Sequence, residues 1–411
     1  MRLIVYSHDA FGLGNIRRML AICQYLIKVY PQVSILVISG SPALHSLRLP
    51  QGLDYIKLPC LGRDELGTVS SKYLETNLDD AVKLRSDLIL STVQNFKPNL
   101  ILVDKKPDGL QQELQETLSY IKTHQPETKL VLLLRDILDR PEATIAQWQR
   151  HGYYDTIAKL YDQVWVVGVP EVFDVCREYQ FPPAVVQKTR FCGYIRREPG
   201  LKSRQVLRQE LQLQPEDKLV LLTPGGGADG YHLIDTYLRG LETQPSNWRS
   251  LIISGSEMRA DQREQIQQRV AHLPLAALLE FTDDLVGYMD AADLVVSMGG
   301  YNTVGEILSL QKRAIVVPRL QPVEEQWLRA ERMAKIGLFQ VIHPNNLNPT
   351  HLMQLIHNEL RAIETSVSSA QLDMNALPRI AKYLSRLVCQ PAFCPAWSNI
   401  SHPVLVATAD C

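Results

Sequence analysis

Short apolar runs of strand length alternate with amphipathic segments along most of the chain, and this rhythm constrains the fold more than any other feature. Runs of this kind are typical of parallel strands that helices cover on both faces. The sequence therefore predicts an α/β fold built from doubly wound, Rossmann-like sheets. The expected strands are 2–7, 33–39, 54–58, 99–103, 129–134 and 163–168, followed by 218–223, 249–254, 278–282, 293–297, 313–317 and 339–342.

A charged stretch with turn residues, 191–200, separates the two series of strands. A chain of 411 residues is long enough for two or three domains, at about 150 residues each. We expect a first Rossmann-like domain over 1–195, a second over 196–375, and a C-terminal helix with an irregular tail over 376–411. A cleft between the two domains is the expected ligand site.

Composition narrows the class of protein. The 43 Lys+Arg and 44 Asp+Glu residues leave a formal net charge of −1, so there is no bulk basic surface of the kind that binds nucleic acid. The apolar runs fall well short of the roughly 18 residues that span a bilayer, and the N-terminus lacks the apolar core of a secretory signal. Seven cysteines without a C-x-x-C pair suit free thiols rather than structural zinc. We expect a cytoplasmic globular protein without a bound metal.

A glycine-containing turn, 7–18, follows the first expected strand and carries Gly12 and Gly14. A dinucleotide fingerprint would need a third glycine where Arg17 stands and an acidic residue after the second strand, so NAD and FAD binding are disfavoured. The Walker sequence is absent, which removes the ordinary P-loop interpretation. The turn is either a ligand loop or a plain tight βα turn.

Consecutive glycines, Gly225, Gly226 and Gly227, follow the first strand of the second domain and precede a helix. Such a turn exposes N–H groups to an anion, and the helix dipole also favours negative charge there. The sequence predicts a phosphate loop, and a flexible turn without a ligand is the alternative.

A second glycine pair, Gly299 and Gly300, follows 293–297 and leads into a helix that Asn302 or Thr303 can cap. The N–H groups of that helix start can bind a diphosphate. Glu306 lies about one helical turn, roughly 5 Å, further in, where its carboxylate can accept hydrogen bonds from a ribose diol. This spacing indicates a nucleoside diphosphate site.

Glu325 and Gln326 begin the helix after the next strand of the second domain. That position overlooks the same crevice, so both side chains can hold hydroxyl groups. Taken alone, the pair would be interpreted as a solvated helix start.

The segment 281–284, the run 293–306 and the pair Glu325-Gln326, in this order and spacing, resemble the C-terminal domain of glycosyltransferase family 28. That family includes the bacterial lipid II N-acetylglucosaminyltransferase and plant galactolipid synthases. The resemblance runs from about residue 218 to 340, and in the first domain it rests mainly on residues 2–26. It implies a GT-B architecture of two Rossmann-like domains facing across a cleft, with a nucleotide sugar bound by the second domain, the acceptor by the first, and no metal or cofactor.

The resemblance also implies roles for individual residues. The diphosphate would face Gly225, Gly226, Gly227, Gly299 and Gly300, beside Asn302 and Thr303. The nucleotide base would face Phe281 and Thr282, the ribose would face Glu306, and the sugar would face Glu325 and Gln326. The residues on the acceptor side would be Gly12, Gly14, Asn15 and Asp104. The sequence departs from the family at Asn15, because these enzymes commonly carry a histidine there. Asparagine cannot accept a proton at neutral pH.

The hypothesised reaction is direct displacement at the anomeric carbon by an acceptor hydroxyl, which inverts configuration. A base must remove the hydroxyl proton. The candidates at strand ends of the first domain are His8 with Asp9, then Asp136, then Asp104. We rank His8 first because its unperturbed pKa lies nearest neutrality.

Several alternatives remain open at this stage. A UDP-sugar 2-epimerase has a similar architecture and needs no acceptor. A nucleotide-sugar-binding or regulatory protein that has lost its base would explain Asn15. The family leans toward UDP, whereas the sugar and the acceptor, whether lipid, glycan or small molecule, are not encoded in these motifs. Relatives with lipid acceptors dock on bilayers, so peripheral membrane contact is a further option.

Overall fold

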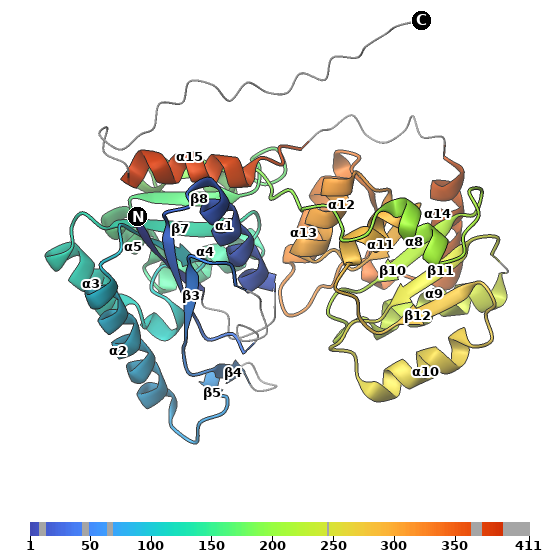
Figure 1. The fold of residues 1–411 in the computed structure, drawn as a ribbon, viewed down its shortest axis with the longest axis horizontal. Helices are drawn as coiled ribbons and strands as arrows, with labels where there is room; N and C mark the ends of the chain where they lie inside the picture. The colour runs from blue at the N-terminus through green and yellow to red at the C-terminus, as the bar shows by residue number, and fades with distance from the viewer. Residues whose placement is uncertain (8–13, 43–48, 64–68, 245, 363–371, 389–411) are drawn as a thin grey trace, which may run out of the picture.

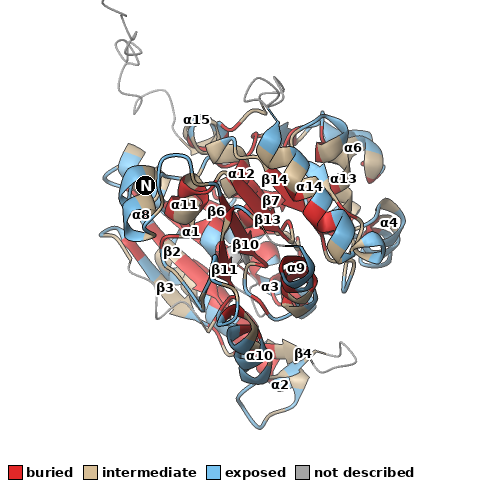
Figure 2. Cartoon of the chain, turned by 90° about the vertical axis from the view of Figure 1, so that its right-hand side faces the viewer, coloured by how far each residue is buried: buried red, intermediate tan, exposed pale blue. Residues whose placement is uncertain are grey.

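Two parallel sheets organise the chain, and helices lie on both faces of each (Figure 1). The computed structural model describes residues 1–7, 14–42, 49–63, 69–244, 246–362 and 372–388. Strand residues are largely buried and the outer helix faces are exposed (Figure 2). The predicted α/β class with two Rossmann-like domains is confirmed.

The first sheet has the strand order β3-β2-β1-β6-β7-β8-β9 in the described part of the chain, with every pairing parallel. Its strands are β1 (Arg2–Ser7), β2 (Ser34–Ser39), β3 (Leu53–Lys57), β6 (Leu100–Asp104), β7 (Lys129–Arg135), β8 (Gln163–Val167) and β9 (Thr189–Phe191). The helices are α1 (Gly14–Val29), α2 (Leu78–Phe96), α3 (Gln115–His124), α4 (Pro141–Arg150), α5 (Tyr153–Leu160), α6 (Val175–Glu178) and α7 (Pro183–Val186), with a 3-10 turn at Leu110–Gln112.

The second sheet, in the same described residues, has the order β12-β11-β10-β13-β14-β15 and is also parallel throughout. Its strands are β10 (Leu219–Thr223), β11 (Arg249–Ile253), β12 (Ala276–Leu279), β13 (Leu294–Ser297), β14 (Ala314–Val316) and β15 (Gln340–Val341). The helices are α8 (Arg204–Glu210), α9 (Tyr231–Thr243), α10 (Ala260–Val270), α11 (Leu285–Ala291), α12 (Tyr301–Leu310), α13 (Glu325–Lys335) and α14 (Pro349–Arg361), with a 3-10 turn at Pro344–Asn346.

Alternation along β1 explains why helices must cover both faces of the first sheet. Leu3 and Val5 pack in one apolar cluster, whereas Ile4 and Tyr6 pack in another, because successive side chains of a strand point to opposite faces. A strand that is apolar on both faces is stable only where two layers of helices exclude water.

Three details differ from the sequence prediction. β12 begins two residues and ends three residues earlier than the expected 278–282, because its register is set by pairing with β11, where Ser250 lies opposite Ala276. The short edge strand β9 was not predicted. Neither was the antiparallel hairpin of β4 (Leu61–Arg63) and β5 (Val69–Ser71). Three-residue strands carry too little alternation to be recognised.

The C-terminal helix α15 (Ala376–Val388) returns to the first domain instead of standing apart from it (Figure 1). Ile380 and Leu384 join the apolar cluster of Leu3 and Val5. The Tyr30 hydroxyl donates to the Ala381 carbonyl at 3.0 Å. The expected irregular tail, 389–411, lies outside the described residues. None of the helices described here is long and apolar enough to cross a membrane.

Candidate active site

The order of the strands places a crevice at the carboxyl edge of each sheet. In the second sheet the chain passes from β10 to β11 on one side, whereas β13 lies on the other side. The loops after β10 and β13 therefore diverge, which is where open α/β sheets bind ligands. Thr223 pairs with Ser297 in register, so both glycine turns begin at the same level of this edge.

Close packing explains the glycines of the first turn. Gly225 and Gly227 have φ values of 85° and 96°, which side chains rarely adopt. A Cβ on Gly227 would lie 2.2 Å from the Ser254 carbonyl oxygen, whereas a Cβ on Gly225 would meet only the Thr303 hydroxyl, at 4.0 Å. The turn is therefore fixed on its protein side and open toward the start of α12.

The second glycine turn, Gly299 and Gly300, is likewise closely packed on one side and open on the other. Gly299 has a φ of 73°, and a Cβ there would lie 2.5 Å from Val316 Cγ1, whereas a Cβ on Gly300 would meet nothing within 4 Å. α12 begins at Tyr301 with Gly300 as its N-cap, and within the described part of the chain no side-chain hydrogen bond caps it. The prediction that Asn302 or Thr303 caps this helix is therefore wrong, because both residues lie inside its first turn. An uncapped start facing open space is suited to an anion.

Glu306 lies one turn further along α12, as predicted. Its Oε2 atom is buried and has no hydrogen-bond partner among the described residues. Burial raises the pKa of the Glu306 carboxyl, and the nearby Arg197 and Arg17 guanidiniums oppose that rise. A buried acceptor of this kind requires a donor, and the hydroxyls of a ribose would supply one.

The loop after β12 presents an aromatic ring. Phe281 is 56% exposed although it is a large apolar residue. Beside it, the Thr282 hydroxyl accepts from the Asp284 N–H at 3.0 Å, and Asp284 in turn caps α11 through the Gly287 N–H at 3.1 Å. The loop is thus held in place while its ring is free to stack on a planar group.

Glu325 does not face an open crevice. Its carboxylate lies 3.1 Å from Arg135 Nη1 and 2.7 Å from Arg329 Nη2. Burial alone would raise the pKa of Glu325, but the two guanidiniums outweigh burial and lower it to about 2. The structure therefore uses this predicted sugar ligand as an ionised contact between the domains.

Gln326 supports the second glycine turn. Its side chain is buried. In the amide orientation that satisfies both groups, its nitrogen donates to the Met298 carbonyl at 2.8 Å and its oxygen accepts from Arg319 Nε at 3.1 Å. Because Met298 precedes Gly299, Gln326 stabilises the turn from the protein side.

The candidate bases of the first domain are placed differently from one another. His8, Asp9 and Gly12 lie outside the described residues, and Gly14 and Asn15 are described only as the backbone start of α1. Asp104 is buried and its carboxylate lies 2.7 Å from Arg18 Nη2.

Asp136 lies in a buried ion pair between the domains. Arg329 donates to both of its oxygens, through Nε at 2.8 Å and Nη2 at 2.9 Å, and the Tyr194 hydroxyl donates at 2.9 Å. Both side chains of the pair are fully buried. With its oxygens occupied in this way, Asp136 has no lone pair directed at an acceptor hydroxyl, and we do not propose it as the base.

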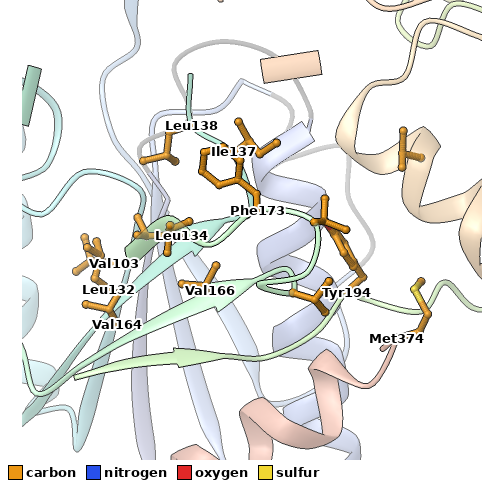
Figure 3. Packing of buried hydrophobic residues seen from close by; sticks show 14 of the residues in the cluster. Val103, Leu132, Leu134, Ile137, Leu138, Val164, Val166, Phe173, Tyr194 and Met374 are labelled. Carbon is orange, nitrogen blue, oxygen red and sulfur yellow. The ribbon is translucent and has the colours of Figure 1, made fainter. Parts of the chain in front are cut away.

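Residues that sequence reasoning missed complete this contact. Tyr301 follows Gly300 and extends into the first domain, where its hydroxyl donates to the Val167 carbonyl at 3.2 Å. The guanidinium carbons of Arg18 and Arg329 lie 5.5 and 5.2 Å from its ring centroid. Tyr194 and Met374 belong to the buried apolar cluster of which Figure 3 shows a part. No short motif in the sequence signals these residues, because their partners are distant along the chain.

The arrangement of two facing Rossmann-like domains is the GT-B fold. A glycosyltransferase of kitacinnamycin superposes with a TM-score of 0.65 at 13% identity, covering 94% of this chain and 99% of that one. MurG of Acinetobacter baumannii gives 0.62 at 14% identity, covering 94% and 99%. A UDP-GlcNAc 2-epimerase of Neisseria meningitidis gives 0.57 at 15% identity, covering 94% and 100%. Likeness at this level of identity shows the fold alone.

Sequence comparison identifies the second domain. Residues 226–384 match the glycosyltransferase family 28 C-terminal domain, so the expected resemblance to that family is confirmed. An uncharacterized glycosyltransferase of Methanopyrus kandleri is 22% identical over 205 residues, 50% of this chain and 56% of the relative. The UDP-N-acetylglucosamine--N-acetylmuramyl-(pentapeptide) pyrophosphoryl-undecaprenol N-acetylglucosamine transferase of Clostridioides difficile is 25% identical over 194 residues, 46% of this chain and 47% of the relative. The match thus spans about half the length of these relatives.

The buried ion pair predicts a difference between two interdomain contacts. Asp136→Asn removes the charge opposite Arg329 in a fully buried position, so the free energy of unfolding should fall by about 3–5 kcal/mol. Glu324→Gln removes an exposed interdomain pair with Arg140, whose side chains are 57% and 34% exposed, and should cost at most about 1 kcal/mol. Urea unfolding measures both variants. Equal losses would show that the buried pair does not hold the domains together.

Proposed function

We propose that this protein transfers a sugar from a nucleoside diphosphate sugar, with UDP as the nucleotide, to an acceptor hydroxyl. The observation that carries the proposal is the buried oxygen of Glu306, which has no hydrogen-bond partner among the described residues and lies one turn from a helix start whose N-cap makes no side-chain hydrogen bond to them. The family 28 match of the same domain supports it. The names of the similar Clostridioides difficile enzyme and of its counterparts in other bacteria support UDP and a lipid-linked acceptor as the substrate classes.

The chemistry follows from the ligand groups that this domain offers. The diphosphate would lie at the start of α12, where backbone N–H groups and the helix dipole stabilise the charge that develops as the sugar leaves. The ribose would bond to Glu306, and the base would stack on Phe281. Stabilisation of this kind needs no metal. The acceptor hydroxyl would attack the anomeric carbon from the opposite side, so the product would be inverted.

His8, with Asp9, is our proposed base. It directly follows β1, and β1 and β6 are the neighbouring strands at which the first sheet changes direction. That switch point is the crevice of the first domain. Asp104 at the end of β6 is ion-paired with Arg18, as described above, which leaves His8 as the candidate whose ordinary pKa suits proton transfer.

Donor binding tests the site directly. Isothermal titration calorimetry with UDP should show saturable binding, and Glu306→Ala should weaken it by about ten- to a hundredfold, because it removes a charged hydrogen-bond acceptor. Glu264→Ala, an exposed position on α10, serves as the matched control. If UDP, GDP, dTDP and ADP all failed to bind the unaltered protein, the phosphate interpretation of both glycine turns would fall.

Transfer tests the base. With a donor that binds, His8→Ala should lower kcat by about a hundredfold or more while leaving UDP affinity unchanged, because general bases contribute on that scale. Asn15→Ala should have a much smaller effect. NMR of the anomeric proton reports inversion, and EDTA reports any metal requirement. Slow hydrolysis that is equal in all three proteins would favour a nucleotide-sugar-binding protein, and a C2-inverted sugar formed without acceptor would favour an epimerase.

Peripheral membrane contact is part of the proposal, because exposed apolar side chains lie on α2 and on the segment before it. Tyr73 and Leu74 precede α2 and are 66% and 49% exposed, and Leu84 and Leu88, one turn apart on α2, are 46% and 37% exposed. Isolated exposed leucines are ordinary, but grouped ones indicate an interaction surface. Lipid acceptors would require such a surface.

Vesicle flotation tests this contact. The double variant Leu84→Ser with Leu88→Ser should lower the fraction of protein that floats with phosphatidylglycerol–phosphatidylethanolamine vesicles, because it removes apolar area available to the bilayer. Val206→Ser, which alters an apolar residue of α8 that is 41% exposed, should not. Flotation that is the same for all variants, or absent for the unaltered protein, would remove the membrane from the proposal.

A further inference from the structure

Lys105 stands at the switch point of the first sheet in a constrained backbone. It directly follows β6, and its N–H donates to the Leu133 carbonyl of β7 at 2.9 Å. Its φ is 63°, and the Lys106 N–H donates across it to the Asp104 carbonyl at 2.7 Å. A three-residue turn with positive φ at its centre is strained, and such strain persists where the surrounding structure fixes it.

The side-chain amine of Lys105 has no direct ion-pair partner among the described residues, although the carboxylates of Glu325 and Asp104 act on it electrostatically. Its Nζ atom makes no hydrogen bond or ion pair within the described part of the chain. Burial, and then the Arg135 guanidinium, lower the pKa of Lys105 to about 7, although Glu325 and Asp104 raise it and Lys106 lowers it further. These four are the charged groups that face it, from β6 and the turn after it, from β7 and from α13.

Arg135, at the end of the neighbouring strand β7, also has unused donor capacity. Its Nη1 lies 3.1 Å from Glu325 Oε1, yet its Nε is buried without a hydrogen-bond partner. The side chain remains 13% exposed, compared with 5% for Glu325. Two cationic groups at the ends of adjacent strands therefore lie beside the interdomain ion pairs with donor atoms that have no partner among the described residues.

The local charge balance limits what can bind there. Around this cluster Arg329 pairs with Asp136, Arg135 with Glu325 and Arg18 with Asp104, so a protonated Lys105 adds one positive charge that has no ion-pair partner among the described residues. A singly charged oxyanion would neutralise the cluster, whereas a dianion would overcompensate it. Buried unpaired charges are costly, so this match matters.

We propose that Lys105 and Arg135 form a subsite for a singly charged oxyanion, and that the acceptor of this protein carries such a group near its reacting hydroxyl. The inference rests on the proposed function, because that function identifies the ligand of this subsite as the acceptor. The acceptor side is assigned because both residues belong to the first domain, whereas the glycine turns and Glu306 belong to the second. The oxyanion is of the kind that a phosphodiester or a carboxylate provides.

The amine gives this subsite a distinct pH dependence. An anion stabilises the protonated amine, so binding takes up a proton when it occurs above about pH 7. Affinity is then full below that pH and is lost as the pH rises through it. A site made only of arginines would not show this dependence.

Competitive acylation tests the subsite without any need for transfer activity. The full-length protein is treated at pH 7 with sulfosuccinimidyl acetate, and modification of Lys105 is followed by mass spectrometry, with the exposed Lys159 as internal reference. Dimethyl phosphate and acetate are the anionic probes, and uncharged trimethyl phosphate is the control. At pH 7 an amine with a pKa of about 7 is half neutral, so the first unit by which a bound anion raises the pKa lowers the neutral fraction, and with it the acylation rate, about fivefold, and each further unit lowers it about tenfold. We expect at least the fivefold slowing for Lys105 at saturation and none for Lys159.

The variants and UDP separate the outcomes. Arg135→Gln should abolish protection, whereas Arg140→Gln, at a 57% exposed side chain of the same face, should keep it. Protection by dimethyl phosphate or by acetate supports the proposal and indicates whether the anionic group of the acceptor resembles a phosphodiester or a carboxylate. No protection by either anion in a protein that binds UDP overturns the subsite alone. Protection by UDP but by neither probe assigns the cluster to the donor diphosphate and also overturns it. Failure of UDP to bind would overturn the proposed donor site while leaving the acylation result decisive.

Discussion

The ion pair between Arg329 and Asp136 determines how every other group at the cleft is placed. It joins α13 of the second domain to Asp136, which directly follows β7 of the first, 193 positions apart along the chain. Transferring both charges out of water is costly, and the attraction repays that cost only where every oxygen and most N–H groups are satisfied. Here Tyr194, the backbone N–H of Ile137 and Glu325 supply the additional bonds. The pair is therefore strong only in this one relative arrangement of the domains.

The chain reinforces that arrangement where it crosses between domains. Tyr194 lies where the chain first passes from the first domain to the second, and Asp373 and Ala376 lie where it returns. The Tyr194 N–H donates to the Asp373 carbonyl at 2.7 Å, and the Tyr194 carbonyl accepts from the Ala376 N–H at 3.1 Å. Arg379 then donates to the Cys192 carbonyl at 2.6 Å. Because α15 is anchored in the apolar cluster of the first domain, the two crossings form one short strap beside Asp136. The Tyr194 hydroxyl thus stabilises the ion pair, while the Tyr194 backbone holds the two crossings together.

The sequence was informative wherever the determining interactions are local. Short apolar runs predicted the strands of both sheets except the short edge strand β9, and the glycine turns stand where their spacing from strand ends predicted them. Glu306 could be placed because one helical turn separates it from the helix start. The role of Glu325 could not be inferred in this way, since the same position at a helix start suits a sugar ligand or an ion pair. Its partner Arg135 lies 190 positions earlier, and only the folded chain brings the two together. Asp136 illustrates the same limit, because nothing adjacent to it in the sequence announces Arg329.

The unsatisfied groups on the two sides of the cleft are opposite in sign. Among the described residues, a carboxylate oxygen of Glu306 in the second domain has no donor, and donors of Lys105 and Arg135 in the first domain have no acceptor. Groups of this kind would gain by pairing with one another if the domains were free to adjust. Arg329 and Tyr301, inserted from the second domain against Asp136 and the Val167 carbonyl, fix a different arrangement in which they do not pair. The fold thus keeps an acceptor and a set of donors unpaired on opposite sides, at a cost in stability that only bound ligands can offset. A hydroxyl-rich donor on one side and an anionic acceptor on the other would meet both requirements at once.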